Sequence, residues 1–86
     1  MTHADSIKDI YNGLVQRYQV NHHFLVENQT PANTLLRSGE KNREAMTHKL
    51  EMMAYIAADL CEPELAGLIL TAASELGSDA VFPTPM

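Results

Sequence analysis

The stretch NREAMTHKLEMMAYIAADLCEPELAGLILTAASEL, residues 42–76, contains two apolar segments that meet at Pro63. In each segment, apolar residues recur at gaps of three and four, the spacing that places them along one side of a helix. Proline removes a backbone donor and restricts the residue before it. The stretch therefore predicts an antiparallel helical hairpin of residues 42–61 and 63–76, with one helix kinked at Pro63 as the alternative. The predicted inner positions are Met46, Leu50, Met53, Ala57 and Leu60, then Leu65, Leu68, Ile69, Ala72 and Leu76.

Upstream of the hairpin, four apolar or aromatic residues at helical spacing predict a helix from about residue 5 to about residue 27. Asp5 or Ser6 is its expected cap, because a short oxygen-bearing side chain satisfies free amides of the first turn. The four residues are Ile7, Tyr11, Leu14 and Tyr18.

The segment between this helix and the hairpin contains residues that interrupt or end helices. Thr30 and Pro31 predict the start of a new, short helix over residues 32–37. Gly39 is expected to end it in the left-handed conformation, and Asn42 is expected to cap the hairpin's first helix.

Length and composition indicate one small globular domain. The chain has 86 residues, of which 45% are hydrophobic. We predict an all-α fold of three to four helices over residues 1–77, followed by a flexible C-terminal tail over residues 78–86, where two prolines interrupt any apolar period. An alternative is that Val81-Phe82-Pro83 acts as an extended docking peptide.

The helix predicted over residues 63–76 is apolar or small nearly all round. A chain of this length has little interior in which to bury such a helix. The sequence therefore predicts a homodimer or an obligate partner protein. The expected interface residues are Leu65, Leu68, Ile69, Leu70 and Ala73.

The preferred function is protein binding, as a small regulator, adaptor or inhibitor that presents a helical apolar surface and carries out no catalysis. Helix-in-groove recognition needs apolar anchors about one turn apart. Met52, Tyr55 and Ile56 are the expected partner-binding residues, and methionine adapts well to different partners.

The charge distribution supports a competing function. Residues 1–50 hold all six Lys and Arg against five acids, whereas residues 51–86 hold six acids and no base, giving a net charge of −5. The alternative is a nucleic-acid-binding transcriptional regulator with a layout like that of a helix-turn-helix. Glutamates interrupt its basic cluster and the chain is acidic overall, which disfavours it. The cluster is Arg37, Lys41, Arg43 and Lys49.

A metal-dependent helical-bundle enzyme is a third, weaker alternative. Glu44, His48 and Glu51 share one helical stripe, but three such residues need further ligands to hold an ion. His22 and His23 are adjacent, so they point about 100° apart on a helix. The chain contains no nucleophile arrangement or phosphate loop. We therefore predict no catalytic residue, no metal and no cofactor.

Compartment and membrane association follow from two patterns. No apolar run approaches the roughly 20 residues that a membrane-spanning helix needs. The segment MTHADSIKD lacks a signal-peptide pattern, and the single Cys61 cannot form an internal disulfide. We expect a cytoplasmic protein without membrane association.

Overall fold

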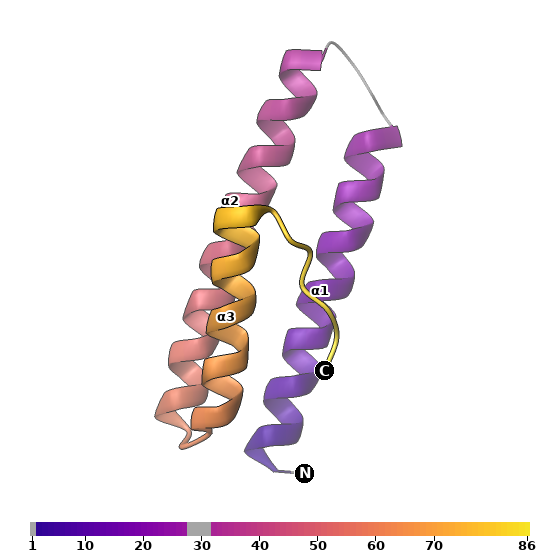
Figure 1. The fold of residues 1–86 in the computed structure, drawn as a ribbon. Helices are drawn as coiled ribbons and strands as arrows, with labels where there is room; N and C mark the ends of the chain where they lie inside the picture. Colours follow the sequence, from indigo (N-terminus) through magenta and orange to yellow (C-terminus); the bar gives the residue numbers. More distant parts are fainter. Residues whose placement is uncertain (1, 28–31) are drawn as a thin grey trace.

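The computed structural model describes residues 2–27 and 32–86, with side chains described for residues 2–23 and 39–86. Three helices and no strand make up this part of the chain: α1 (His3–Glu27), α2 (Ala32–Asp59) and α3 (Pro63–Asp79) (Figure 1). The predicted all-α class is confirmed. None of the described helices is both long and apolar enough to cross a bilayer.

The first helix begins earlier than its sequence signals suggested. The Thr2 hydroxyl accepts a hydrogen bond from the Asp5 amide at 3.2 Å, and the Asp5 carboxylate accepts one from the Thr2 amide at 3.3 Å. This reciprocal pair is a capping box, which satisfies two free amides at once. The cap is therefore Thr2, and the prediction of Asp5 or Ser6 as the cap was wrong.

The second helix is continuous where a break was predicted. It runs from Ala32 through Gly39 and Asn42 to Asp59, so the short separate helix, its left-handed end and the cap at residue 42 were wrong. No described glycine has a positive φ. A glycine inside a helix costs only about 1 kcal/mol relative to alanine, which the packing of a long helix can offset. The predicted start of Thr30 and Pro31 lies outside the described residues.

Pro63 starts a new helix instead of kinking one. Residues 60–62 turn the chain between α2 and α3, and Cys61 adopts a left-handed φ of 61°. The Cys61 amide donates to the Ala58 carbonyl and the Glu62 amide to the Ala57 carbonyl, so carbonyls at the end of α2 are satisfied. Pro63 is then the first helical residue, where its missing amide is tolerated.

The core lies on the inner faces of the three helices. Thirteen buried residues form it, and none of the buried residues described is polar or charged apart from the tyrosine hydroxyls. Three expected inner residues are outside the core: Leu60 belongs to the corner, Leu68 is 58% exposed, and Ala72 is only partly buried against the core. The core residues are Ile7, Tyr11, Val15 and Tyr18 of α1, Met46, Leu50, Met53, Ala54 and Ala57 of α2, and Leu65, Ile69, Ala73 and Leu76 of α3.

The helices do not pack equally. α2 and α3 share the largest interface, and Gly77 lies so close to α2 that a β-carbon there would stand 3.2 Å from Thr47 Cγ2. α3 continues past Gly77 to Asp79. α1 packs on α2 but hardly touches α3, and the C-terminal segment runs between α1 and α3 (Figure 1).

Candidate protein-binding surfaces

The outer side of α2 carries an apolar stripe of three side chains, Met52, Tyr55 and Ile56. Their exposed fractions are 48%, 63% and 49%. Positions three and four apart are neighbours on a helix surface, so the three form one patch. The inner side of the same turns is fixed in the core through Leu50, Met53 and Ala57, which holds the stripe outward.

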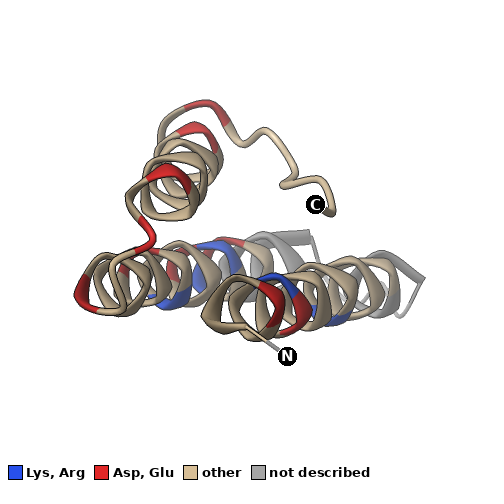
Figure 2. Ribbon diagram, turned by 90° about the horizontal axis from the view of Figure 1, so that it is seen from below, with Lys and Arg blue, Asp and Glu red and all other residues tan. Residues whose placement is uncertain are grey.

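Acidic residues flank this stripe. Glu51 and Asp59 lie one helical turn before and after Tyr55, on the same side of α2. No basic residue occurs after Lys49. Accordingly, Figure 2 shows acidic but no basic positions on α3 and in the corner that leads to it. The stripe therefore combines apolar anchors with two carboxylates beside Tyr55, while the exposed Lys49 lies one turn before Met52.

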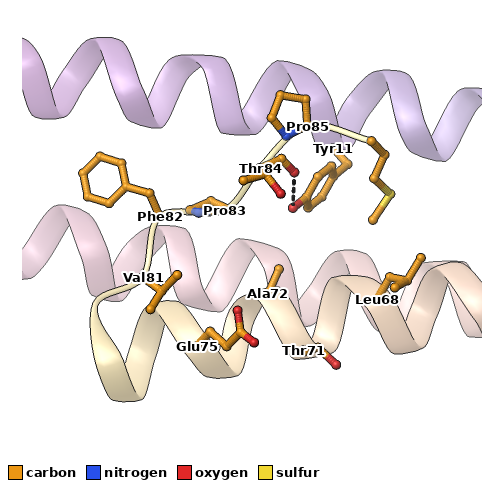
Figure 3. Close-up of a pocket in the computed structure, with 11 residues that line it drawn as sticks. Tyr11, Leu68, Thr71, Ala72, Glu75, Val81, Phe82, Pro83, Thr84 and Pro85 are labelled. Carbon is orange, nitrogen blue, oxygen red and sulfur yellow. Dashed lines mark hydrogen bonds between the residues drawn. The ribbon is translucent and has the colours of Figure 1, made fainter.

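A second surface is the groove between α1 and α3. Residues 81–86 run along it and line a pocket together with Tyr11 of α1 and with Leu68, Thr71, Ala72 and Glu75 of α3 (Figure 3). The Tyr11 hydroxyl donates to the Thr84 carbonyl at 3.0 Å. Asn12 binds the backbone of Met86 twice: its Oδ1 accepts from the Met86 amide at 2.8 Å, and its Nδ2 donates to the Met86 carbonyl at 3.2 Å. All three bonds go to main-chain atoms of the tail.

Aromatic rings hold the other end of the tail. The Phe82 ring meets Tyr18 with centroids 5.3 Å apart and His22 with centroids 4.8 Å apart, both edge-on. Such edge-to-face pairs are favourable beyond the area they bury. Pro83, next to Phe82, is buried. The tail thus contacts α1 through rings at one end and through hydrogen bonds at the other.

The groove tyrosines are held in a poorly hydrated environment. Burial raises the pKa of Tyr11 above its usual 10.0. Burial also raises the pKa of Tyr18, and the charge of Arg43 acts on it in the opposite direction. Both hydroxyls are therefore protonated near neutral pH. Tyr11 accordingly acts as the donor in its bond to the tail.

The tail leaves its helix through a left-handed residue. Ala80, directly after α3, has a φ of 54° and a ψ of 32°. The amides of Ala80 and Val81 both point to the Glu75 carbonyl, the arrangement that commonly closes a helix with glycine at the left-handed position. The flexibility predicted for residues 78–86 stays a prediction. In the structure the last six of them run between α1 and α3, where Pro83 is buried and the other five are exposed.

The predicted dimer residues divide into two groups. Leu65, Ile69 and Ala73 are buried in the chain's own core. Leu68 and Leu70 are exposed, but they are two positions apart and so point about 200° apart around α3. The structure therefore leaves two separate apolar positions on α3 for a second copy.

The basic cluster does not form one face in the part that the structure describes. Lys41 and Lys49 are exposed, whereas Arg43 is half-buried and points about 200° away from Lys41 around α2. The turn that suggested a helix-turn-helix layout is replaced by continuous helix. The side chain of Arg37 lies outside the described residues.

The histidine stripe lies beside a shallow pocket. Glu44, His48 and Glu51 line it together with Arg43 and Thr47. Among residues with described positions, no group of three or more His, Cys, Asp or Glu side chains is arranged to hold a metal ion. Of the adjacent pair His22 and His23, His22 belongs to the ring cluster of the tail groove.

Comparison with known proteins adds no family assignment. The chain matches no protein-family model, no curated protein and no solved structure.

Sequence spacing does not predict that Tyr11, Asn12 and Tyr18 contact the C-terminal segment. The two tyrosines fit the helical spacing of the first helix, and both are buried in the core. One sequence signal for this contact was present: Phe82-Pro83-Thr84-Pro85 is a proline-rich segment, and such segments bind grooves lined by aromatic side chains. The partner of such a segment, however, lies about 70 positions away, and sequence spacing does not reveal it.

Proposed function

We propose that this chain is a small protein-binding regulator, adaptor or inhibitor that acts through the apolar stripe Met52, Tyr55 and Ile56 of α2. The observation that supports this most is that three large apolar side chains stand about half exposed or more, one turn apart, on a helix whose other side is fixed in the core. Clustered exposed apolar residues of this kind mark interaction sites more often than single ones do.

The partner we propose is an amphipathic helix with basic residues beside its apolar face. Apolar anchors at one-turn spacing fit the apolar side of another helix. Glu51 and Asp59 beside Tyr55, together with the absence of any base after Lys49, favour a cationic rim on the partner. An acidic partner is disfavoured by the same charges.

The test uses three forms of the full chain: wild type, Met52→Ser/Ile56→Ser, and Val20→Ser. Val20 lies on α1 and is 61% exposed, so its replacement is a matched loss of exposed apolar surface elsewhere. Each form is immobilised and incubated with native cell lysate. The proteins that it captures are quantified by mass spectrometry. The captured partner is then purified and titrated against each form at low and high salt.

We expect wild type and Val20→Ser to capture the same partner, and the double variant to bind it at least tenfold more weakly. Affinity should fall with added salt, because opposite charges at the rim are screened. Equal binding by the double variant, or duplex DNA as the sole tight ligand, would overturn the proposal.

Self-association is a separate proposal: a homodimer through α3. Since Leu65, Ile69 and Ala73 are buried in the chain, its contacts would centre on Leu68 or Leu70. Sedimentation equilibrium of wild type, Leu68→Ser and Leu70→Ser tests it. A concentration-dependent dimer that one of these changes abolishes supports the proposal, and a monomer at every concentration contradicts it.

A further inference from the structure

We propose that the groove between α1 and α3 is a recognition site for an extended Phe-Pro-x-Pro segment of a partner protein. Residues 82–85 of this chain lie along it, with Pro83 buried and Phe82 39% exposed, as an intramolecular competitor. This site is distinct from the α2 stripe. The docked tail itself shows which peptide chemistry the groove accepts (Figure 3).

At one end of the groove, side chains of α1 form hydrogen bonds with the main chain of the tail. Tyr11 and Asn12 donate to the carbonyls of Thr84 and Met86, and Asn12 accepts from the Met86 amide. Side chains that bind main-chain atoms fix the direction and register of a peptide without specifying its side chains. Proline in the segment limits the flexibility that docking must remove, which favours binding of such segments.

The other end of the groove selects an aromatic side chain. Tyr18 and His22 present their rings to Phe82 at centroid distances of 5.3 Å and 4.8 Å. The adjoining Pro83 is buried against the groove. A phenylalanine followed by proline is therefore the specific part of the ligand, with the backbone bonds setting its register.

The tail is joined to α3 by a residue in an unfavourable conformation. Ala80 holds a left-handed φ of 54°, which is costly for any residue with a β-carbon. Undocking the tail lets Ala80 leave this conformation, so the joint favours release. A peptide offered by a partner forms the same groove contacts without this strain.

The groove continues beyond the position of Met86. A pocket of about 460 Å³ adjoins it, lined by Ala4, Leu65 and Leu68 and by the charged residues Lys8, Glu62 and Glu64. A partner segment that extends past the methionine position gains apolar contacts there. This pocket gives an advantage to a partner segment that places an apolar residue after that position.

The experiment releases the tail by a change where it joins α3, which leaves the groove side chains of α1 unchanged. Ala80→Pro excludes the positive φ and removes the amide that points to Glu75, whereas the matched control Ala80→Gly keeps the left-handed conformation accessible. Both full chains are titrated by fluorescence anisotropy with labelled AVFPTPM, the sequence of residues 80–86. The comparison peptides carry Phe82→Ala or add a leucine after the methionine.

We expect Ala80→Pro to bind AVFPTPM at least tenfold more tightly than Ala80→Gly, because a tethered competitor acts at an effective concentration of order millimolar. The peptide with Phe82→Ala should bind at least tenfold more weakly than AVFPTPM. The leucine-extended peptide should bind more tightly than AVFPTPM. Circular dichroism verifies that each chain is helical.

Several outcomes would overturn the proposal. A helical Ala80→Pro chain that binds no better than Ala80→Gly shows that the groove does not accept the segment in trans. Equal binding of the Phe82→Ala peptide removes the claimed selectivity. If light scattering shows an Ala80→Pro dimer that AVFPTPM dissociates, the occupant is a second copy and the partner assignment is wrong. Should Ala80→Pro fail to fold, the full chain with Phe82→Ala replaces it, with the same expected gain.

Discussion

Asn12 and Met86, 74 positions apart in the chain, are joined by two hydrogen bonds between the side-chain amide of one and the backbone of the other. Asn12 thus binds the tail as a neighbouring β-strand would, with one donor and one acceptor. This pairing determines where the tail lies along α1.

Replacing Asn12 with alanine should loosen the tail near Met86 while leaving the helices intact. Both hydrogen bonds are lost, and the Met86 amide should exchange with solvent several-fold faster, as each exposed hydrogen bond contributes about 0.5–1.5 kcal/mol. Amide exchange by nuclear magnetic resonance measures this directly. Gln16→Ala, an exposed change one turn further along α1, is the control and should leave that rate unchanged.

Tyr11→Phe should lower the free energy of unfolding by about 1 kcal/mol. The change removes the hydroxyl that donates to the Thr84 carbonyl but keeps the buried ring. Urea denaturation measures the loss. Tyr55→Phe removes a hydroxyl from a side chain that is 63% exposed and should have almost no effect. Equal effects of the two changes would contradict the assigned role of the Tyr11 bond.

Stability should fall at alkaline pH. Burial raises the pKa of Tyr11 and Tyr18 above 10.0 in the folded chain. Above about pH 10 the unfolded chain therefore loses these phenolic protons while the folded chain still retains them. The unfolded state then binds fewer protons, so the free energy of unfolding decreases as pH rises through the folded pKa values.

Urea denaturation at about pH 8 and about pH 11 tests this prediction, with the pH values chosen on either side of the ordinary tyrosine pKa. Tyr11→Phe/Tyr18→Phe should show a smaller alkaline loss than wild type. A loss of the same size in the double variant would mean that other groups are responsible.

Ile69→Ala and Leu70→Ala should differ sharply although the two residues are adjacent. Ile69 is fully buried and Leu70 is 47% exposed. The first change leaves a cavity and should cost about 2–5 kcal/mol, while the second should cost less than about 1 kcal/mol. Thermal or urea denaturation distinguishes them. Similar losses would indicate that Leu70 is covered in solution, as in a dimer through α3.

Gly39→Ala should stabilise the chain by up to about 1 kcal/mol. Gly39 lies inside α2 without a positive φ, and a β-carbon there meets nothing within 4 Å. Alanine therefore gains helix propensity without a clash. A destabilising effect would instead support the left-handed helix end that the sequence suggested.

Periodicity predicted the helices where they are long and their apolar spacing is regular. The buried positions Met46, Leu50, Met53 and Ala57 followed directly from that spacing. The start of α2 could not be predicted in this way, because Gly39 and Ser38 are local breaking signals that the whole helix overrides. Local propensity is a weak term beside the packing of a long helix.

The exposed stripe of α2 was predictable because Met52, Tyr55 and Ile56 fall outside the strict inner spacing. The tail groove was not, because its two sides come from opposite ends of the chain. Nothing local to Phe82 indicates that Tyr18 and His22 will lie beside it. Such contacts depend on how the helices are arranged.

The bond from Tyr11 to Thr84 also fixes an order of events during synthesis on the ribosome. The first helix is made some 70 residues before the segment that contacts it. Until translation reaches that segment, the face of α1 that carries Tyr11 stays open to whatever binds nascent chains. A chaperone present at that moment meets this face before the chain's own tail does.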